Sequence, residues 1–204
     1  MFGFGLHTST DVLGLGLQDG DALIVGTWPE GRKLAETLHS RIQEILAGHP
    51  WSELGWVAVC LGPGSFTGTR IGVITVRTIA QALNIPTIGI SALAAIAEAS
   101  QIEGDIAVSL DARRGDRFAA LFRRDPENLF VLRTDILVEA PQWADWLATL
   151  PEATTHIDGD SISPLPIAAL MTLANRQFEQ NQTQPWQTLE PFYGRPAPIH
   201  PGAL

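Results

Sequence analysis

The sequence predicts a mixed α/β protein, and three observations support this prediction. Short apolar runs alternate with polar turns over residues 2–26, which is typical of an antiparallel meander. From residue 32 onward, amphipathic helical segments alternate with short apolar runs, as in a sheet whose buried strands are covered by helices. After residue 104 a layout of three short strands recurs. We therefore expect two related α/β units within the 204 residues of the chain.

Each element of the first half is predicted from its apolar pattern and its flanking residues. Wholly apolar runs are assigned to buried strands, and apolar residues that recur every three or four positions are assigned to helices. Glycine, proline and short polar clusters mark the ends, and Ser91 is the expected N-cap of one helix. On these grounds we expect strands at 2–6, 12–17, 22–26, 55–61 and 87–90, and helices at 32–47, 69–83 and 92–99.

The second half follows the same rules and resembles the first in layout. Its first predicted strand ends at Asp111 before a polar turn, just as the first strand of the chain ends at His7. We infer a weak structural duplication and place the two units at 1–102 and 103–204. The expected elements are strands at 106–110, 118–122 and 129–132, a helix at 141–150, and an irregular tail after residue 180.

The composition argues against several classes of protein. The chain has 13 Lys+Arg against 22 Asp+Glu, a formal net charge of −9, which opposes direct binding to nucleic acid. Its hydrophobic content of 45% is too high for a disordered chain. No apolar run reaches the roughly 18 residues that a membrane helix needs, so we expect no membrane association. The single cysteine, Cys60, cannot form an internal disulfide, and we expect a cytoplasmic protein.

Tests for catalytic and metal sites give no candidate. The five histidines have none of the spacings that bind a catalytic metal, and no serine stands in a Gly-x-Ser-x-Gly turn. Cys60 lies inside an apolar strand, where a thiol behaves as a small hydrophobic group. We therefore expect no catalytic residue, no resident metal and no cofactor.

Residues 62–68 form a glycine-rich loop between a predicted strand and a predicted helix, a place where phosphates commonly bind. The loop lacks the lysine of a P-loop, and its last glycine comes one position late for a dinucleotide fold. Two interpretations stay open. The loop is either a tight turn that packs backbones closely or a site where Ser65, Thr67 and Arg70 make polar contacts.

The same loop supports a resemblance to a known family. Residues 61–73, LGPGSFTGTRIGV, closely resemble the signature of the bacterial TsaB (YeaZ) family. Further matches follow in the family's order, so the resemblance spans nearly the whole chain. These matches are residues 8–10, 85–86, 89–93, 110–113 with Gly115, and 191–195.

This resemblance implies a two-lobed α/β fold like that of the actin, hexokinase and Hsp70 superfamily, with an RNase H-like sheet in each lobe. It implies a non-catalytic subunit in the synthesis of N6-threonylcarbamoyladenosine, the modified base beside the tRNA anticodon. The implied partners are TsaD, in a heterodimer, and the ATPase TsaE, in a larger complex. A homodimer in isolation is an alternative, and contact with tRNA is expected to be indirect.

One residue departs from the family's pattern. His7 stands where the family usually has Asp at the end of the first strand. A histidine does not replace the oxygen ligand that a magnesium-nucleotide requires, so we expect little independent ATP turnover. A small ATP-dependent kinase or ATPase of the same superfamily remains the alternative function.

Two surfaces are candidates for function. The helix at 69–83 has more apolar residues than one core-facing stripe needs, so we expect it to meet TsaD together with the helix at 32–47. Changing Ile74 or Val76 to Asp should then abolish the complex and leave the fold intact. The alternative for these two helices is that both are buried in their own lobe. The second candidate surface is the charged turn after Asp111, and its alternative interpretation is a turn that is merely solvated. The expected interface residues are Leu34, Leu38, Ile42, Arg70, Val73, Ile74 and Arg77, and the residues expected to face a nucleotide or the other lobe are Gly62, Gly64, Ser65, Thr67, Asp111 and Arg113.

Overall fold

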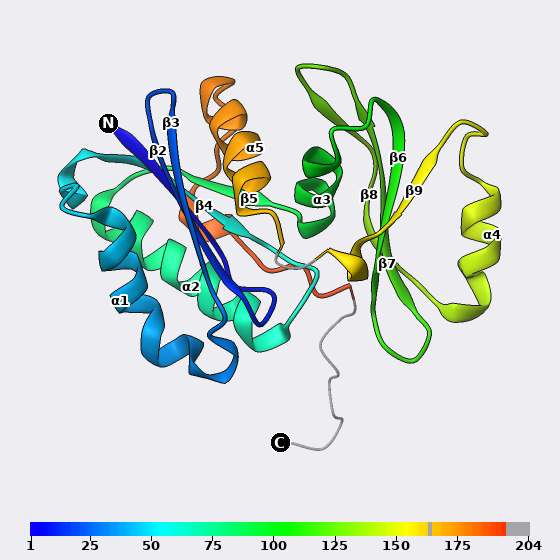
Figure 1. Cartoon of the computed structure of the whole chain (residues 1–204), viewed down its shortest axis with the longest axis horizontal. Coiled ribbons are helices and arrows are strands. Elements are labelled where there is room, and N and C mark those ends of the chain that lie inside the picture. Colours follow the sequence, from blue (N-terminus) through cyan, green and yellow to red (C-terminus); the bar gives the residue numbers. More distant parts are fainter. Residues whose placement is uncertain (163–164, 195–204) are drawn as a thin grey trace.

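Two β-sheets organise the chain into two lobes (Figure 1). The computed structural model describes residues 1–162 and 165–194. The first sheet has the strand order β3-β2-β1-β4-β5, and the second has the order β8-β7-β6-β9. In each sheet three strands form an antiparallel meander, and a later strand pairs in parallel with the first of them. The predicted mixed α/β class and the repeated layout are confirmed.

The elements of the first lobe lie close to their predicted positions. Helix α1 follows the meander, α2 follows β4, and α3 follows β5 and leads to the second lobe. The bounds are β1 (Phe2–His7), β2 (Leu13–Asp19), β3 (Ala22–Trp28), α1 (Leu34–Leu46), β4 (Leu54–Cys60), α2 (Phe66–Leu83), β5 (Thr87–Ile90) and α3 (Ala92–Ser100), with short 3₁₀ turns η1 (Gly31–Lys33) and η2 (Trp51–Glu53).

The second half of the chain contains one strand and one helix that the sequence analysis did not predict. These are β9, which is only four residues long, and α5, which carries a clear amphipathic pattern. The bounds are β6 (Gly104–Asp111), β7 (Arg117–Arg124), β8 (Leu129–Val138), η3 (Ala140–Gln142), α4 (Trp143–Ala148), β9 (Thr155–Asp158), η4 (Gly159–Ser161), α5 (Ile167–Glu179) and η5 (Trp186–Thr188).

Helices α3 and α5 lie between the two sheets, while α1 and α2 cover the opposite face of the first sheet (Figure 1). Ile88 of β5, Ile96 of α3, Leu170 of α5 and Phe122 of β7 are all buried in one apolar core that both lobes share. A separate core joins α1 and α2 to the first sheet. Because the middle core contains residues of both lobes, burial of its apolar surface holds the lobes together.

Helix α5 follows the second sheet in the sequence but packs on β1, β2 and β5 of the first sheet and on α3. The division into 1–102 and 103–204 therefore stays a prediction, and part of the later segment completes the first lobe. Within the two described ranges, no helix is both long enough and apolar enough to cross a bilayer.

Helix starts show where local hydrogen bonds decide the structure. Ser91 caps α3 as predicted, because its Oγ accepts from the N–H groups of Leu93 (3.0 Å) and Ala94 (3.3 Å). Helix α2 begins at Phe66, earlier than predicted, because Ser65 Oγ accepts from the Gly68 N–H (3.3 Å). The glycine-rich loop thus ends at an N-cap and contributes the first turn of the helix.

Candidate functional site

Two turns from opposite lobes face each other across a cleft of about 630 Å³. The first turn follows β1 and contributes Thr10 and Asp11, and the second follows β6. The glycine-rich loop and Phe118 complete the lining. The two turns that the sequence analysis compared, after His7 and after Asp111, therefore meet in space. Of the residues expected to face a nucleotide or the other lobe, those that line the cleft are Gly64, Ser65, Thr67, Asp111 and Arg113.

Gly62 is the exception, because it is buried at the start of the loop and does not line the cleft. Its φ of 92° is a left-handed conformation that glycine adopts without strain. Its carbonyl accepts from the Ala92 N–H (2.7 Å), which joins the loop to the start of α3. The expectation that Gly62 faces a nucleotide in this cleft is corrected, while the alternative, that it faces the other lobe, stays a prediction.

The glycine-rich loop packs directly on the turn after β1. Thr8 Oγ1 donates to the Gly68 carbonyl (2.8 Å), and the Ser65 N–H donates to the Ser9 carbonyl (2.7 Å). A Cβ on Gly64 or Gly68 would collide with the backbone oxygen of Ser9 or of Thr8, well inside the 3.0 Å that real Cβ atoms keep. The spacing of these glycines therefore has a packing cause, and it leaves Ser65 and Thr67 free to line the cleft.

His7 ends β1 but is wholly buried behind the cleft. Its Nδ1 lies 3.1 Å from Ser9 Oγ, and its Nε2 lies 3.2 Å from Thr10 Oγ1. Burial lowers the pKa of His7 from 6.5 to about 4, so the imidazole is neutral at pH 7. A neutral imidazole whose two nitrogens contact hydroxyl groups orders this turn and supplies no negative charge to the cleft.

Cys60 is the last residue of β4, and its Sγ lies 3.4 Å from Ser9 Oγ, the hydroxyl group that also contacts His7. Burial raises the pKa of the thiol to about 11, so the reactive thiolate is scarce at neutral pH. Among residues 1–162 and 165–194, no group of three or more His, Cys, Asp or Glu is placed to hold a metal ion. Cys60 therefore fits a packing role.

The far wall of the cleft is a strained, charged turn. Arg113 and Arg114 have φ values of 66° and 59°, which are uncommon for residues other than glycine. The turn is tied down because the Arg113 N–H donates to Asp111 Oδ1 (3.1 Å) and the Asp111 N–H donates to Asp160 Oδ1 (2.9 Å). Its exposed guanidinium and carboxylate groups can contact a polar ligand or a partner.

The predicted partner interface needs correction at most of its positions. Leu34, Leu38 and Ile42 of α1 and Val73 of α2 retain only 2–6% exposure and pack in the core beneath the helices. Val76 is also fully buried, so Asp there would disrupt the fold. The apolar stripe of each helix is thus used by its own sheet, as the alternative interpretation held. Ile74, 63% exposed, and the exposed Arg70 remain available to a partner, with Arg77 half-buried.

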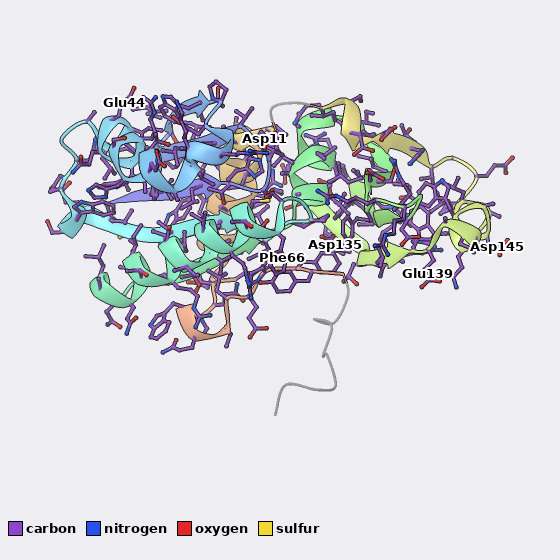
Figure 2. All side chains as sticks on the ribbon, turned by 90° about the horizontal axis from the view of Figure 1, so that it is seen from below. Asp11, Glu44, Phe66, Asp135, Glu139 and Asp145 are labelled. Carbon is purple, nitrogen blue, oxygen red and sulfur yellow. The ribbon has the colours of Figure 1, made fainter. Side chains whose placement is uncertain are left out.

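An exposed surface on α2 was only partly anticipated. Phe66, Arg70 and Ile74 lie one turn apart on the outer side of the helix, and Phe66 is 58% exposed. Figure 2 labels Phe66 near the first turn of α2. The Arg70 guanidinium lies 4.5 Å from the centroid of the Phe66 ring, and its Nε donates to Tyr193 Oη (2.9 Å). We call Phe66, Arg70, Ile74 and Tyr193 the α2 surface stripe. The i, i+4, i+8 spacing was visible in the sequence, but the contact with Tyr193 was not.

Comparison with known proteins agrees with this architecture. The family model described as "TsaD: tRNA N6-adenosine threonylcarbamoyltransferase" matches residues 25–144, more than half of the chain. The "tRNA threonylcarbamoyladenosine biosynthesis protein TsaB" of Escherichia coli is 26% identical and aligns with 86% of this chain and 90% of its own length. Its namesake from Bacillus subtilis is 37% identical over 49% of this chain and 43% of its own.

Solved structures extend the likeness to the fold. "YeaZ from Pseudomonas aeruginosa" superposes with a TM-score of 0.77 at 21% identity, covering 94% of this chain and 99% of that one. A second Pseudomonas aeruginosa structure, described as similar to "peptidase YEAZ", gives 0.79 at 22% identity, covering 95% and 99%. The two-lobed RNase H-like fold of the actin, hexokinase and Hsp70 superfamily is confirmed. The chain therefore belongs to the TsaB (YeaZ) family, within the wider group that the TsaD model describes.

Proposed function

We propose that this protein is a non-catalytic subunit in the synthesis of N6-threonylcarbamoyladenosine on tRNA, and that it acts by binding TsaD, with TsaE joining the pair. The names of its relatives in two bacteria support the pathway. The observation that carries the mode of action is the α2 surface stripe, because apolar side chains stay exposed there while the opposite side of the helix is buried against its own sheet.

The stripe has the chemistry of a docking surface. Aromatic residues and arginine are the side chains that contribute most to protein interfaces. Arg70 is held between Phe66 and Tyr193, so little side-chain entropy is lost when it pairs with a carboxylate of TsaD. Arg77 lies over the Trp186 ring, 5.8 Å from its centroid, and extends this surface along the helix.

The cleft between the lobes supports one alternative, a small ATP-dependent kinase or ATPase. It holds Asp11 and Asp111 from opposite lobes and Arg113, which are groups that a nucleotide and its metal could contact. The neutral, buried His7 weakens this alternative, since it replaces a carboxylate at the end of β1. Steady-state ATP hydrolysis by the isolated protein would favour the alternative, and hydrolysis only in the presence of TsaD would favour the proposal.

The proposal is tested by reconstitution. TsaD, TsaE, the enzyme that makes threonylcarbamoyl-adenylate, and tRNA are combined with and without this protein, and modified adenosine is measured by mass spectrometry after tRNA digestion. We expect formation of the modified base to depend on this protein and TsaD to co-elute with it in gel filtration. Undiminished modification in its absence, or no complex with TsaD, would refute the proposal.

The surface assignment is tested with a matched pair of variants. Ile74→Asp places a charge in the stripe, and Phe130→Asp makes the same kind of change at a 50% exposed apolar residue on β8 of the other lobe. We expect the first variant to bind TsaD about tenfold or more weakly and the second to bind it as tightly as the unmodified protein. Equal binding by both variants would show that TsaD docks elsewhere.

A further inference from the structure

A second cavity, of about 350 Å³, lies between the lobes and shares no lining residue with the cleft. It is formed where β5, α3 and α5 meet β7 and β8 of the second sheet. Phe192 lines this cavity, and its ring lies 6.0 Å, centroid to centroid, from Phe118, which lines the cleft. The aromatic pair therefore stands between two separate cavities.

The walls of this cavity are mainly apolar. Ile90 of β5, Phe122 of β7, Leu129 of β8 and Leu173 of α5 face it from different elements. Val131, which is 57% exposed, lies at its open side. Its volume falls within the range of about 300–1,000 Å³ that is typical of small-molecule sites, which are mostly apolar with a few placed polar groups.

Asp135 of β8 is the single charged residue among the described residues that line this cavity. Its Oδ2 accepts from Ser91 Oγ (2.6 Å). Ser91 Oγ itself accepts two N–H groups of α3, so its one proton is committed to Asp135. Figure 2 shows Asp135 near the junction of the lobes, far from Asp145 at the outer end of the second lobe.

The Asp135 carboxylate has no cationic partner within residues 1–162 and 165–194. Desolvation raises its pKa to about 6, so at pH 7 it is still mostly ionised in a poorly hydrated place. A buried or half-buried carboxylate without a counter-ion is costly unless a ligand pairs with it. An ammonium group would supply both the missing charge and hydrogen-bond donors.

We propose that this cavity binds a small organic ammonium compound, with its charged nitrogen on Asp135 and its apolar body against Phe122, Leu129 and Leu173. The single negative charge selects cations against anions, and the apolar walls select against strongly hydrated inorganic ions. Gln177, also in the lining, offers a further polar contact to the ligand. This proposal is independent of the role in tRNA modification.

The test compares three probes of nearly equal shape on the full-length protein: phenethylamine, which is cationic at pH 7, neutral 2-phenylethanol and anionic phenylacetate. Binding is followed by titration of ¹H–¹⁵N amide shifts. We expect the amine to bind about tenfold or more tightly than the alcohol, as a charge-assisted hydrogen bond would give, and phenylacetate not to bind. The shifts should fall on residues 89–94 and 129–135.

Variants separate recognition of the amine by Asp135 from nonspecific hydrophobic binding. Asp135→Asn should reduce the affinity for the amine to that for the alcohol, whereas Asp145→Asn, at an exposed carboxylate of α4, should change nothing. If Asp135→Asn proves unfolded by circular dichroism, Val131→Lys at the exposed rim provides a competing ammonium and should abolish binding of the amine. Equal affinities for amine and alcohol in the unmodified protein, or unchanged amine binding in the folded Asp135→Asn or Val131→Lys variant, would overturn the proposal.

Discussion

Gly68→Ala tests whether the glycine-rich loop is built around close backbone packing. Gly68 is buried in the first turn of α2, and an added methyl group would collide with the Thr8 carbonyl oxygen. That oxygen cannot swing away as a flexible side chain would, because it belongs to a backbone segment whose Thr8 hydroxyl donates to Gly68 (2.8 Å). The new methyl group must therefore push the helix away from the turn.

The magnitude follows from two opposing effects. Overpacking a rigid contact costs typically about 1–3 kcal/mol, and a backbone partner places this case toward the upper end. Replacing glycine by alanine within a helix returns up to about 1 kcal/mol. We expect a net loss of about 1–2 kcal/mol in the free energy of unfolding.

The assay is chemical denaturation in urea followed by circular dichroism, with Gly55→Ala as the matched control. At Gly55 the three atoms nearest to the added methyl group all belong to the flexible side chain of Met1, which can move. We expect this control to change the free energy of unfolding by no more than about 0.5 kcal/mol. If Gly68→Ala is as stable as the unmodified protein, the packing explanation of the loop is wrong.

Two further predictions concern stability. Because the pKa of His7 falls from 6.5 to about 4 on folding, the unfolded state binds its proton first as the pH drops. The stability that depends on neutral His7 is present above pH 6.5 and is lost toward pH 4, by up to about 3 kcal/mol. The raised pKa of Asp135 changes the free energy of unfolding in the opposite direction as the pH falls. The quantity to measure is therefore the difference in free energy of unfolding between the unmodified protein and His7→Gln at each pH. If this difference stays constant from pH 7 to 4, the role of His7 is wrong. Arg117→Met should lower the free energy of unfolding by about 1–2 kcal/mol, because Arg117 donates to Asp158 (2.7 Å), Asp160 (2.9 Å) and Ser109 (2.9 Å) and so ties β9 to its neighbours. Arg114→Met, at an exposed residue of the charged turn that precedes β7, should stay within about 0.5 kcal/mol, and an equal loss in both variants would refute the role of Arg117.

The parts of the fold that were predictable depend on local patterns. Ser91 was identified as an N-cap because a serine directly before an apolar helical run has a specific use for its hydroxyl group. Helix α5 was missed although Ile167, Leu170, Met171 and Ala174 recur at helical spacing on its buried face. Strand β9 gave no usable signal, because it has four residues, most of them exposed.

The sites were predictable only where sequence order fixes spatial position. The turns after β1 and β6 meet because both lobes repeat one topology, so Asp111 and Arg113 could be placed opposite the glycine-rich loop. The apolar stripe of a helix, by contrast, does not tell whether a sheet or a partner covers it, which is why Leu34 and Val73 were misassigned. Asp135 and Tyr193 act through contacts across long stretches of chain, which no spacing rule reveals.

A titration of the modification reaction separates docking through α2 from a role of this protein in the reaction itself. Increasing amounts of unmodified protein or of Ile74→Asp are added to TsaD, TsaE, threonylcarbamoyl-adenylate and tRNA, and the initial rate of modification is measured. A charge at a buried interface position should raise the half-maximal concentration about tenfold or more and leave the rate at saturation unchanged. A lowered rate at saturation with an unchanged half-maximal concentration would show that Ile74 acts in the reaction, and docking of TsaD on α2 would then be wrong.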